Sequence, residues 1–344
     1  MKKYIFLSLI LFAAWACTKT IEFDDNGVGN LIVLNSIIYP DSCVSGNISQ
    51  STSILKGNRY GGFIDGTVEL YENGNKVGQM NPLFGKFRFP EIKPKAGNTY
   101  RIVVISGGKQ AEAETTMPEK AEIVSVDTTT ISNEWGGKSL NCNIKFHDSG
   151  DEDFYRIIIT DESMIRLTNL RDSVKFRYFV YRYSSTINSD DPVFKSVYNN
   201  FGTDILDMGP DNMYGIFPDD YFQGKEYSIQ TLTSVFSHEY DGYPTDNLTY
   251  FNHQVYSRKI IQIQKLSKSF YNYMKYLRLY SFYRDDPFAE PVPVYSNIEN
   301  GAGIFGSFND EAKFTMEKIY VPFSMDTIKV EPTNNGYGGG YYYY

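Results

Sequence analysis

Residues 67–79 read TVELYENGNKVGQ, in which two strand-like segments flank Asn73-Gly74. An Asn-Gly pair accepts the two positive φ angles of a type I′ turn, the turn whose twist matches a two-residue β-hairpin. The valine, leucine and tyrosine of the first flank favour strands. The segment therefore predicts a β-hairpin.

The neighbouring residues extend this β pattern on both sides of the hairpin. Tyr100–Ser106 and Lys109–Thr116 flank Gly107-Gly108 and predict a second hairpin, and residues 31–39 (LIVLNSIIY) form another strand candidate. Short strands separated by glycine and proline turns are typical of a β-sandwich. We expect an immunoglobulin-like β-sandwich over residues 31–118.

Residues 119–332 predict a larger β-rich domain that carries one amphipathic helix. The strand candidates are Glu122–Val126, Leu140–Phe146, Phe154–Thr160, Ser173–Tyr183, Lys225–Leu232, Arg258–Lys265 and Phe314–Phe323. The helix is expected over residues 267–283 with Ser267 as its N-cap. Its core-facing stripe is expected to be Phe270, Met274, Leu277 and Tyr280, which recur at helical spacing. The predicted fold class is all-β.

Two further segments lack a clear period. Residues 184–219 are polar and form either an extended functional loop or a set of short strands. Residues 333–344 (TNNGYGGGYYYY) predict a flexible Gly/Tyr tail. The alternative for the tail is a segment that becomes ordered when it docks on a partner.

The N-terminus predicts export and lipid anchoring. Residues 1–16 combine Lys2-Lys3 with an apolar run of about 20 Å, which is too short to span a bilayer and typical of a signal peptide. Cys17 follows Ala13, Ala14 and Ala16 in a lipobox-like order, although Ala14 and Trp15 depart from the preferred residues. We expect cleavage before Cys17, lipidation of Cys17 with fatty acids such as palmitate, and a tether over residues 17–30. The alternative is an ordinary cleaved signal with a coincidental cysteine.

Charge and composition exclude a nucleic-acid partner. The net charge is −8, and removal of Lys2 and Lys3 with the signal peptide makes it −10. Such a surface repels phosphates. The basic residues are densest at Arg258, Lys259, Lys265, Lys268, Lys275, Arg278 and Arg284, which we interpret as a solvated face. Aromatic residues make up 16% of the chain, and we expect most of them to serve core packing.

Cys43 and Cys142 remain once Cys17 is lipidated. They fall in different predicted domains, and neither has a metal-ligating partner at a suitable spacing. An exported protein permits a disulfide. We expect two buried free thiols instead.

No catalytic motif emerges, so we expect a chain that is not an enzyme and needs no cofactor. His238-Glu239 begins an HExxH pattern, but the second histidine is missing. Within the acidic run of residues 148–153, Asp148, Asp151 and Asp153 are weak metal candidates, and a solvated turn is the favoured interpretation. The alternative function is a surface glycan- or peptide-hydrolase with an unrecognised site near these acids or His238-Glu239.

The most specific motif is Asp286-Pro287-Phe288 followed by residues 297–306 (NIENGAGIFG). We interpret it as a turn-rich connection whose glycines permit positive φ and whose Ile304-Phe305 pair fills the core. Together with the aromatic helix SFYNYMKYLRLY, the phrase at residues 217–227 and the lipidated start, it resembles the Bacteroidota outer-membrane lipoprotein family catalogued as domain of unknown function 4249. The resemblance covers residues from about 30 to 325.

The resemblance implies a lipid-anchored outer-membrane protein exposed on the cell surface, without an established enzymatic activity. It also implies an outer-membrane protein partner, a SusC-like TonB-dependent transporter. Cys17 is the residue to which it assigns a role. We therefore expect a non-catalytic binding or accessory subunit, and neither its ligand nor the face of the membrane on which it works follows from the sequence.

Overall fold

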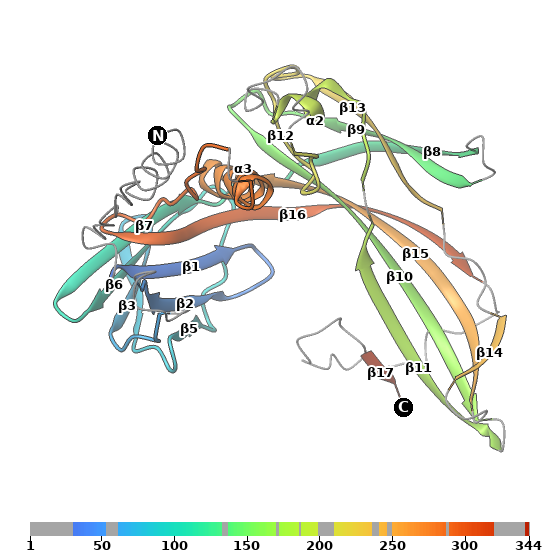
Figure 1. The fold of residues 1–344 in the computed structure, drawn as a ribbon, viewed down its shortest axis with the longest axis horizontal. Helices are drawn as coiled ribbons and strands as arrows, with labels where there is room; N and C mark the ends of the chain where they lie inside the picture. Colours follow the sequence, from blue (N-terminus) through green and yellow to red (C-terminus); the bar gives the residue numbers. More distant parts are fainter. Residues whose placement is uncertain are drawn as a thin grey trace, which may run out of the picture.

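The computed structural model describes residues 30–52, 61–132, 137–169, 172–185, 187–198, 210–235, 241–245, 250–286, 289–319 and 341–343. The predicted signal peptide, Cys17 and His238-Glu239 lie outside these residues. Figure 1 shows two β-rich bodies side by side, crossed by one long strand. We call them the N-terminal sandwich and the C-terminal body. The predicted all-β class is confirmed.

The N-terminal sandwich consists of the four-stranded sheet β4-β3-β6-β7 and the β5-β2-β1-β16 end of a ten-stranded sheet that continues into the C-terminal body. Its strands are β1 (Ile32–Ile38), β2 (Val44–Gln50), β3 (Thr67–Glu72), β4 (Asn75–Met80), β5 (Lys86–Phe89), β6 (Thr99–Ser106), β7 (Lys109–Thr116) and β16 (Gly301–Ile319). Alternate residues of these strands face a shared core, with Leu34, Ile48, Leu70 and Ile102 wholly buried. The period-2 pattern of the sequence therefore produces a two-layer sandwich.

Both predicted hairpins form with the expected turns. Asn73 and Gly74 connect β3 to β4 with φ angles of 49° and 81°. Gly107 and Gly108 connect β6 to β7 with φ angles of 56° and 75°. These local predictions are confirmed because the turn residues themselves select the backbone conformation.

Strand β16 belongs to both bodies. Its first part pairs in parallel with β1, from Ile32↔Gly301 to Ile38↔Ser307, and its later part pairs antiparallel with β15 (Tyr250–Leu266). The prediction of a turn-rich connection at residues 301–306 is therefore wrong, since these residues form a strand. Positive φ is retained at Asn300 (54°) and Gly303 (108°), and Phe305 is wholly buried as expected. The sandwich thus includes a strand from outside the expected range 31–118.

The C-terminal body places the sheet β13-β9-β8 over the β11-β10-β15-β16 part of a ten-stranded sheet (Figure 1). Its remaining strands are β8 (Glu122–Ser132), β9 (Lys138–His147), β10 (Phe154–Asn169), β11 (Asp172–Ser184), β12 (Ile216–Pro218), β13 (Glu226–Ser234), β14 (Asp241–Thr245) and β17 (Tyr341–Tyr343). Every strand candidate has a counterpart, but β8, β10 and β15 are much longer than predicted. Polar residues extend these strands, so hydrophobic alternation underestimates their length.

Rings fill the core between these layers. Phe146 packs edge-on against Phe222 at 5.4 Å between centroids, Tyr155 stacks on Phe217 at 5.7 Å, and Phe222 stacks on Tyr227 at 4.5 Å. Such pairs stabilise a core beyond the area that they bury. The high aromatic content is used here for packing, as expected.

The described residues include the helices α2 (Pro192–Ser196) and α3 (Lys268–Tyr283). The Ser267 hydroxyl accepts a hydrogen bond from the Phe270 amide and caps α3 as predicted. The predicted stripe is correct at Met274 but wrong at Tyr280, which is 40% exposed, because the buried residues are Tyr271, Met274 and Leu279. The expectation of a single helix is also wrong: α2 lies in the unperiodic stretch 184–219, where five residues are too short to show a period.

The two cysteines described are free thiols in different bodies. Cys142 is buried in the C-terminal body, and burial raises the pKa of its thiol to about 11. Cys43 is half-buried, so the prediction of a buried thiol is wrong there.

Of the tail predicted to be flexible, the structure describes Tyr341–Tyr343. These residues form β17, which pairs antiparallel with Tyr178–Val180 at the edge of β11. Among the described residues, no helix is long and apolar enough to cross a membrane.

Candidate functional site

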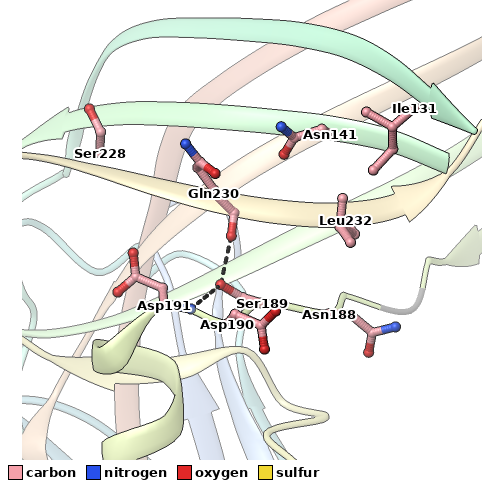
Figure 2. Close-up of a pocket in the computed structure, with 9 residues that line it drawn as sticks. All are labelled: Ile131, Asn141, Asn188, Ser189, Asp190, Asp191, Ser228, Gln230 and Leu232. Carbon is pink, nitrogen blue, oxygen red and sulfur yellow. Dashed lines mark hydrogen bonds between the residues drawn. The ribbon is translucent and has the colours of Figure 1, made fainter. Parts of the chain in front are cut away.

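A groove of about 470 Å³ opens on the outer face of the sheet β13-β9-β8. Three side-chain amides line it, those of Asn141, Asn188 and Gln230, and we call it the amide groove. The rest of its lining consists of Ile131, Leu232, Ser189, Ser228, Asp190 and Asp191. Figure 2 shows β8, β9 and β13 side by side, with the segment of residues 188–191 below β13.

Strand alternation places these side chains on the outer face. Along β13, Ile229, Thr231 and Thr233 are buried, so Ser228, Gln230 and Leu232 point to the opposite side. Along β9, Leu140, Cys142 and Ile144 are buried, and Asn141 therefore points outward beside its register partner Leu232. The apolar core residues of both strands thus orient the polar ones.

The segment of residues 187–191 forms the other wall. Asn188 exchanges two backbone hydrogen bonds with Leu232, of 3.0 and 2.7 Å, and the Ser189 hydroxyl donates to the Gln230 carbonyl at 2.6 Å (Figure 2). The amide of Asp191 in turn donates to the Ser189 hydroxyl at 3.2 Å. This wall is therefore held against the edge of β13 by main-chain bonds.

Asp191 fixes the end of the wall. Its Oδ1 accepts hydrogen bonds from the Val193 amide at 3.1 Å, as the N-cap of α2, and from the Tyr227 hydroxyl at 2.9 Å. Burial, and after it the hydrogen bond to Asp191, raises the pKa of Tyr227 to about 12. Tyr227 therefore remains a protonated donor at physiological pH. The hydrogen bond from Lys195 lowers the pKa of the neighbouring Asp190, which stays ionised.

The chemistry of the groove suits binding rather than covalent catalysis. The described residues that line it include carboxylates, amides and hydroxyls but no histidine, cysteine, lysine or arginine. A hydroxyl nucleophile such as Ser189 would need an adjacent base, and it donates instead to a main-chain carbonyl. The arrangement offers a set of neutral donors and acceptors with two negative charges at one end.

The predicted metal candidates lie elsewhere and form part of a closed network. Asp148 is 1% exposed and accepts hydrogen bonds from the Tyr155 hydroxyl at 2.6 Å and the Gly224 amide at 2.6 Å. Asp153 accepts from Ser149 at 2.6 Å and forms an ion pair with Lys265, whereas Asp151 is exposed. Within the described part of the chain, no group of three or more His, Cys, Asp or Glu is arranged to hold a metal ion. The solvated-turn prediction is wrong for Asp148 and Asp153, which are buried because their bonding partners satisfy them.

The basic residues of β15 are also internal. Lys259 is wholly buried and forms an ion pair with Asp161 at 2.5 Å, and Lys265 is 6% exposed. The prediction of a solvated face is therefore wrong for these two lysines. It is correct for Lys268, which pairs with Glu152 at 2.8 Å on the surface. The number of charges along the sequence does not distinguish these lysines, because their acidic partners, Asp161, Asp153 and Glu152, are about 100 residues away in the sequence.

Replacing Asp219 by asparagine should stabilise the protein near neutral pH. Asp219 is 2% exposed, and burial, with the charges of Asp148 and Asp153 also contributing, raises its pKa. The unfolded chain therefore loses this proton at a lower pH than the folded chain, and wild-type stability from this group falls as the pH rises through the folded pKa. The gain of Asp219→Asn over wild type should vanish below about pH 3.8, the ordinary value for this group.

Urea denaturation between pH 3 and pH 8 measures this difference. Asp151→Asn is the matched control, because Asp151 is exposed in the same acidic region. A loss of stability for Asp219→Asn at pH 7 would contradict the raised pKa of the buried Asp219. The same pH-dependent gain for Asp151→Asn would show that the effect does not depend on burial.

The sequence identified neither the groove nor its amides. The two strands that carry Asn141 and Gln230 were predicted. The alternation of apolar and polar residues within Leu140–Phe146 and Lys225–Leu232 indicates that these two side chains face outward. The missing information is the pairing of Asn188 with Leu232, a contact between distant segments.

Comparison with known proteins gives a family but no characterised relative. The family model described as "Domain of unknown function (DUF4249)" matches residues 18–313. No curated protein matches the chain. Among solved structures, the "Putative membrane anchored protein from Corynebacterium diphtheriae" aligns with 11% identity and a TM-score of 0.18, over 83% of this chain and 59% of that one. The chain thus spans about three-fifths of that protein, and the likeness is too low to carry an argument.

Proposed function

This chain belongs to the family described as domain of unknown function DUF4249, and from that membership we propose that it is a lipid-anchored, non-catalytic binding subunit of the outer membrane. In this proposal Cys17 carries the lipid and the protein faces the cell surface. Its protein partner would be a TonB-dependent transporter. The lipobox-like start and the resemblance to outer-membrane lipoproteins support these points.

One observation supports binding over catalysis more than any other. The buried charges of the C-terminal body are bonded to one another, whereas the groove is lined by amides and hydroxyls and by two carboxylates, Asp190 and Asp191, at one end. Catalytic sites concentrate perturbed ionisable groups in the cleft where substrate binds. Here Asp219 and Tyr155, whose pKa values burial raises, are part of the internal network around Asp148 and Asp153. The groups with shifted pKa values at the groove, Tyr227 and Asp190, are held in bonds to Asp191 and Lys195.

Strand β16 suits a subunit that presents a binding surface at a distance from its anchor. Its Phe305 enters the core of the N-terminal sandwich, and its Phe314 and Met316 pack on the core of the C-terminal body. A single strand running through both cores restricts hinge motion between the bodies. The C-terminal body, which carries the amide groove, would thereby keep a fixed position relative to the N-terminal sandwich.

Replacing Cys17 by serine should release the protein from the membrane without unfolding it. The two hydrophobic cores of the described chain consist of residues from Ile32 onward, and the substitution changes a single side-chain atom. Two lipid signals are generally needed for stable anchoring, and loss of the acylated cysteine removes the chains that provide them. Cell fractionation of wild type and Cys17→Ser measures the effect, and circular dichroism checks the fold.

The matched control is Cys43→Ser, which should remain with the membrane. Protease treatment of intact cells then tests exposure, with degradation of wild-type protein as the expected result. A Cys17→Ser variant that stays fully membrane-bound would contradict lipid anchoring. Complete protection from protease in intact cells would contradict surface display.

A further inference from the structure

We propose that the amide groove binds a neutral carbohydrate, which rests on the proposed function as a binding subunit and names its ligand class. The site consists of Asn141, Asn188, Gln230, Ser189, Ser228 and the carboxylate pair Asp190-Asp191, in a groove of about 470 Å³. Asn141, Ser228 and Gln230 project from the outer face of the sheet, away from the core of the C-terminal body. Ser189 and Asp191 belong to the neighbouring segment and also hold it in place.

The hydrogen-bonding capacity of the groove is unused by the protein. Within the part of the chain that the structure describes, the amides of Asn141, Asn188 and Gln230 and the hydroxyl of Ser228 form no hydrogen bond with other protein groups. Each amide offers both a donor NH2 group and an acceptor carbonyl. A sugar hydroxyl likewise donates and accepts, so a polyhydroxylated ligand can satisfy every one of them.

The charge of the lining selects against anions. Asp190 and Asp191 are carboxylates, and although Asp190 pairs with Lys195 beside the groove at 2.7 Å, the lining residues described include no cation to pair with a phosphate, sulfate or uronate. Ionised carboxylates accept strong hydrogen bonds from hydroxyl donors. The Tyr227 hydroxyl and the Val193 amide both donate to Oδ1 of Asp191. Neither of these hydrogen bonds uses Oδ2, which can therefore accept one from a ligand hydroxyl.

The shape of the groove suits a chain of sugars. It extends from β8 across β9 and β13 to the segment of residues 188–191, three spacings of about 4.8 Å or roughly 14 Å. Ile131, 41% exposed, and Leu232 provide apolar surface for the C–H faces of sugar rings. Main-chain bonds hold both walls, so little ordering entropy is lost when a ligand binds.

An extended peptide fits this site less well. A peptide that adds to a sheet needs a free strand edge. At Leu232 that edge is already occupied, because Asn188 donates to and accepts from its backbone at 3.0 and 2.7 Å. The groove therefore offers side-chain contacts on the face of a sheet, and at Leu232 it offers no free backbone groups to which a peptide strand could bond.

Binding of neutral oligosaccharides to the full chain in detergent tests the proposal. An array of neutral, sulfated and uronate-containing oligosaccharides and of unstructured peptides is screened first, and isothermal titration then measures the affinity of the strongest ligand. We expect a neutral oligosaccharide to bind, and Gln230→Ala and Asn141→Ala each to weaken it roughly fivefold or more. Gln110→Ala and Asn47→Ala, exposed strand amides of the N-terminal sandwich, should leave the affinity unchanged.

The inference is overturned if no neutral oligosaccharide binds, if acidic sugars or peptides bind instead, or if the groove variants bind like the controls. Its failure is separable from that of the proposed function. A membrane-anchored chain that binds no neutral sugar contradicts the ligand class alone, whereas a sugar-binding chain that is free of the membrane contradicts the anchor alone.

Discussion

Replacing Lys259 by methionine should lower the free energy of unfolding by about 3–5 kcal/mol. The Lys259 side chain is 0% exposed and its partner Asp161 is 2% exposed, so the variant leaves a buried carboxylate without its counter-ion. Hydroxyl groups of Ser185 and Ser234 also face Asp161, but neutral donors do not replace a full positive charge. Urea denaturation followed by circular dichroism measures the loss.

Two variants separate the buried charge from the loss of contacts. The double variant Asp161→Leu/Lys259→Met removes both charges and should recover most of the lost stability, because apolar residues often replace a buried pair at little cost. Lys145→Met breaks the surface pair with Glu226, whose side chains are 39% and 48% exposed, and should cost far less stability because solvent screens an exposed ion pair. Equal losses for Lys259→Met and Lys145→Met would mean that Lys259 is not buried.

Replacing Gly303 by alanine should disrupt the pairing of β16 with β1 in the N-terminal sandwich. Gly303 has a φ of 108°, and an added Cβ would clash with the carbonyl oxygen of Leu34 on β1. Positive φ alone costs a residue with a side chain about 1–3 kcal/mol. The clash adds to this cost, because the atom that would have to move is main chain in the paired strand.

Gly74→Ala is the matched control for this prediction. Gly74 has a φ of 81°, but a Cβ there would meet nothing within 4 Å. Gly74→Ala therefore carries the cost of the positive φ but causes no clash, and its loss of stability should be clearly smaller than that of Gly303→Ala. Gly303→Ala should also make the N-terminal sandwich more sensitive to limited proteolysis than Gly74→Ala does. Equal losses in the two variants would show that the β1–β16 register is wrong.

Local sequence signals predicted the parts of the fold that local chemistry controls. Asn73-Gly74 and Gly107-Gly108 each specify a turn through their own φ angles, and Ser267 caps α3 through a bond to a residue three positions away. The signals for these features lie within a few residues of each other. They could therefore be interpreted without knowledge of the tertiary structure.

The features that the sequence did not reveal depend on distant contacts. Gly301–Gly306 contains four glycines or alanines in six residues and looks like a turn, yet pairing with β1 makes it a strand. Lys259 belongs to a run of basic residues that looks solvated, and its burial depends on Asp161 on another strand. The amide groove likewise requires residues 188–191 to lie along β13. Hydrophobic periodicity reports which face of a strand is buried but not which strands become neighbours.

We propose that this chain works as an anchored subunit of an outer-membrane complex. Affinity purification of the full chain from detergent-solubilised native membranes, followed by mass spectrometry, tests it directly. The account predicts that a TonB-dependent transporter is recovered in near-stoichiometric amount with the protein. Recovery of the chain alone, under conditions that preserve other outer-membrane complexes, would contradict it.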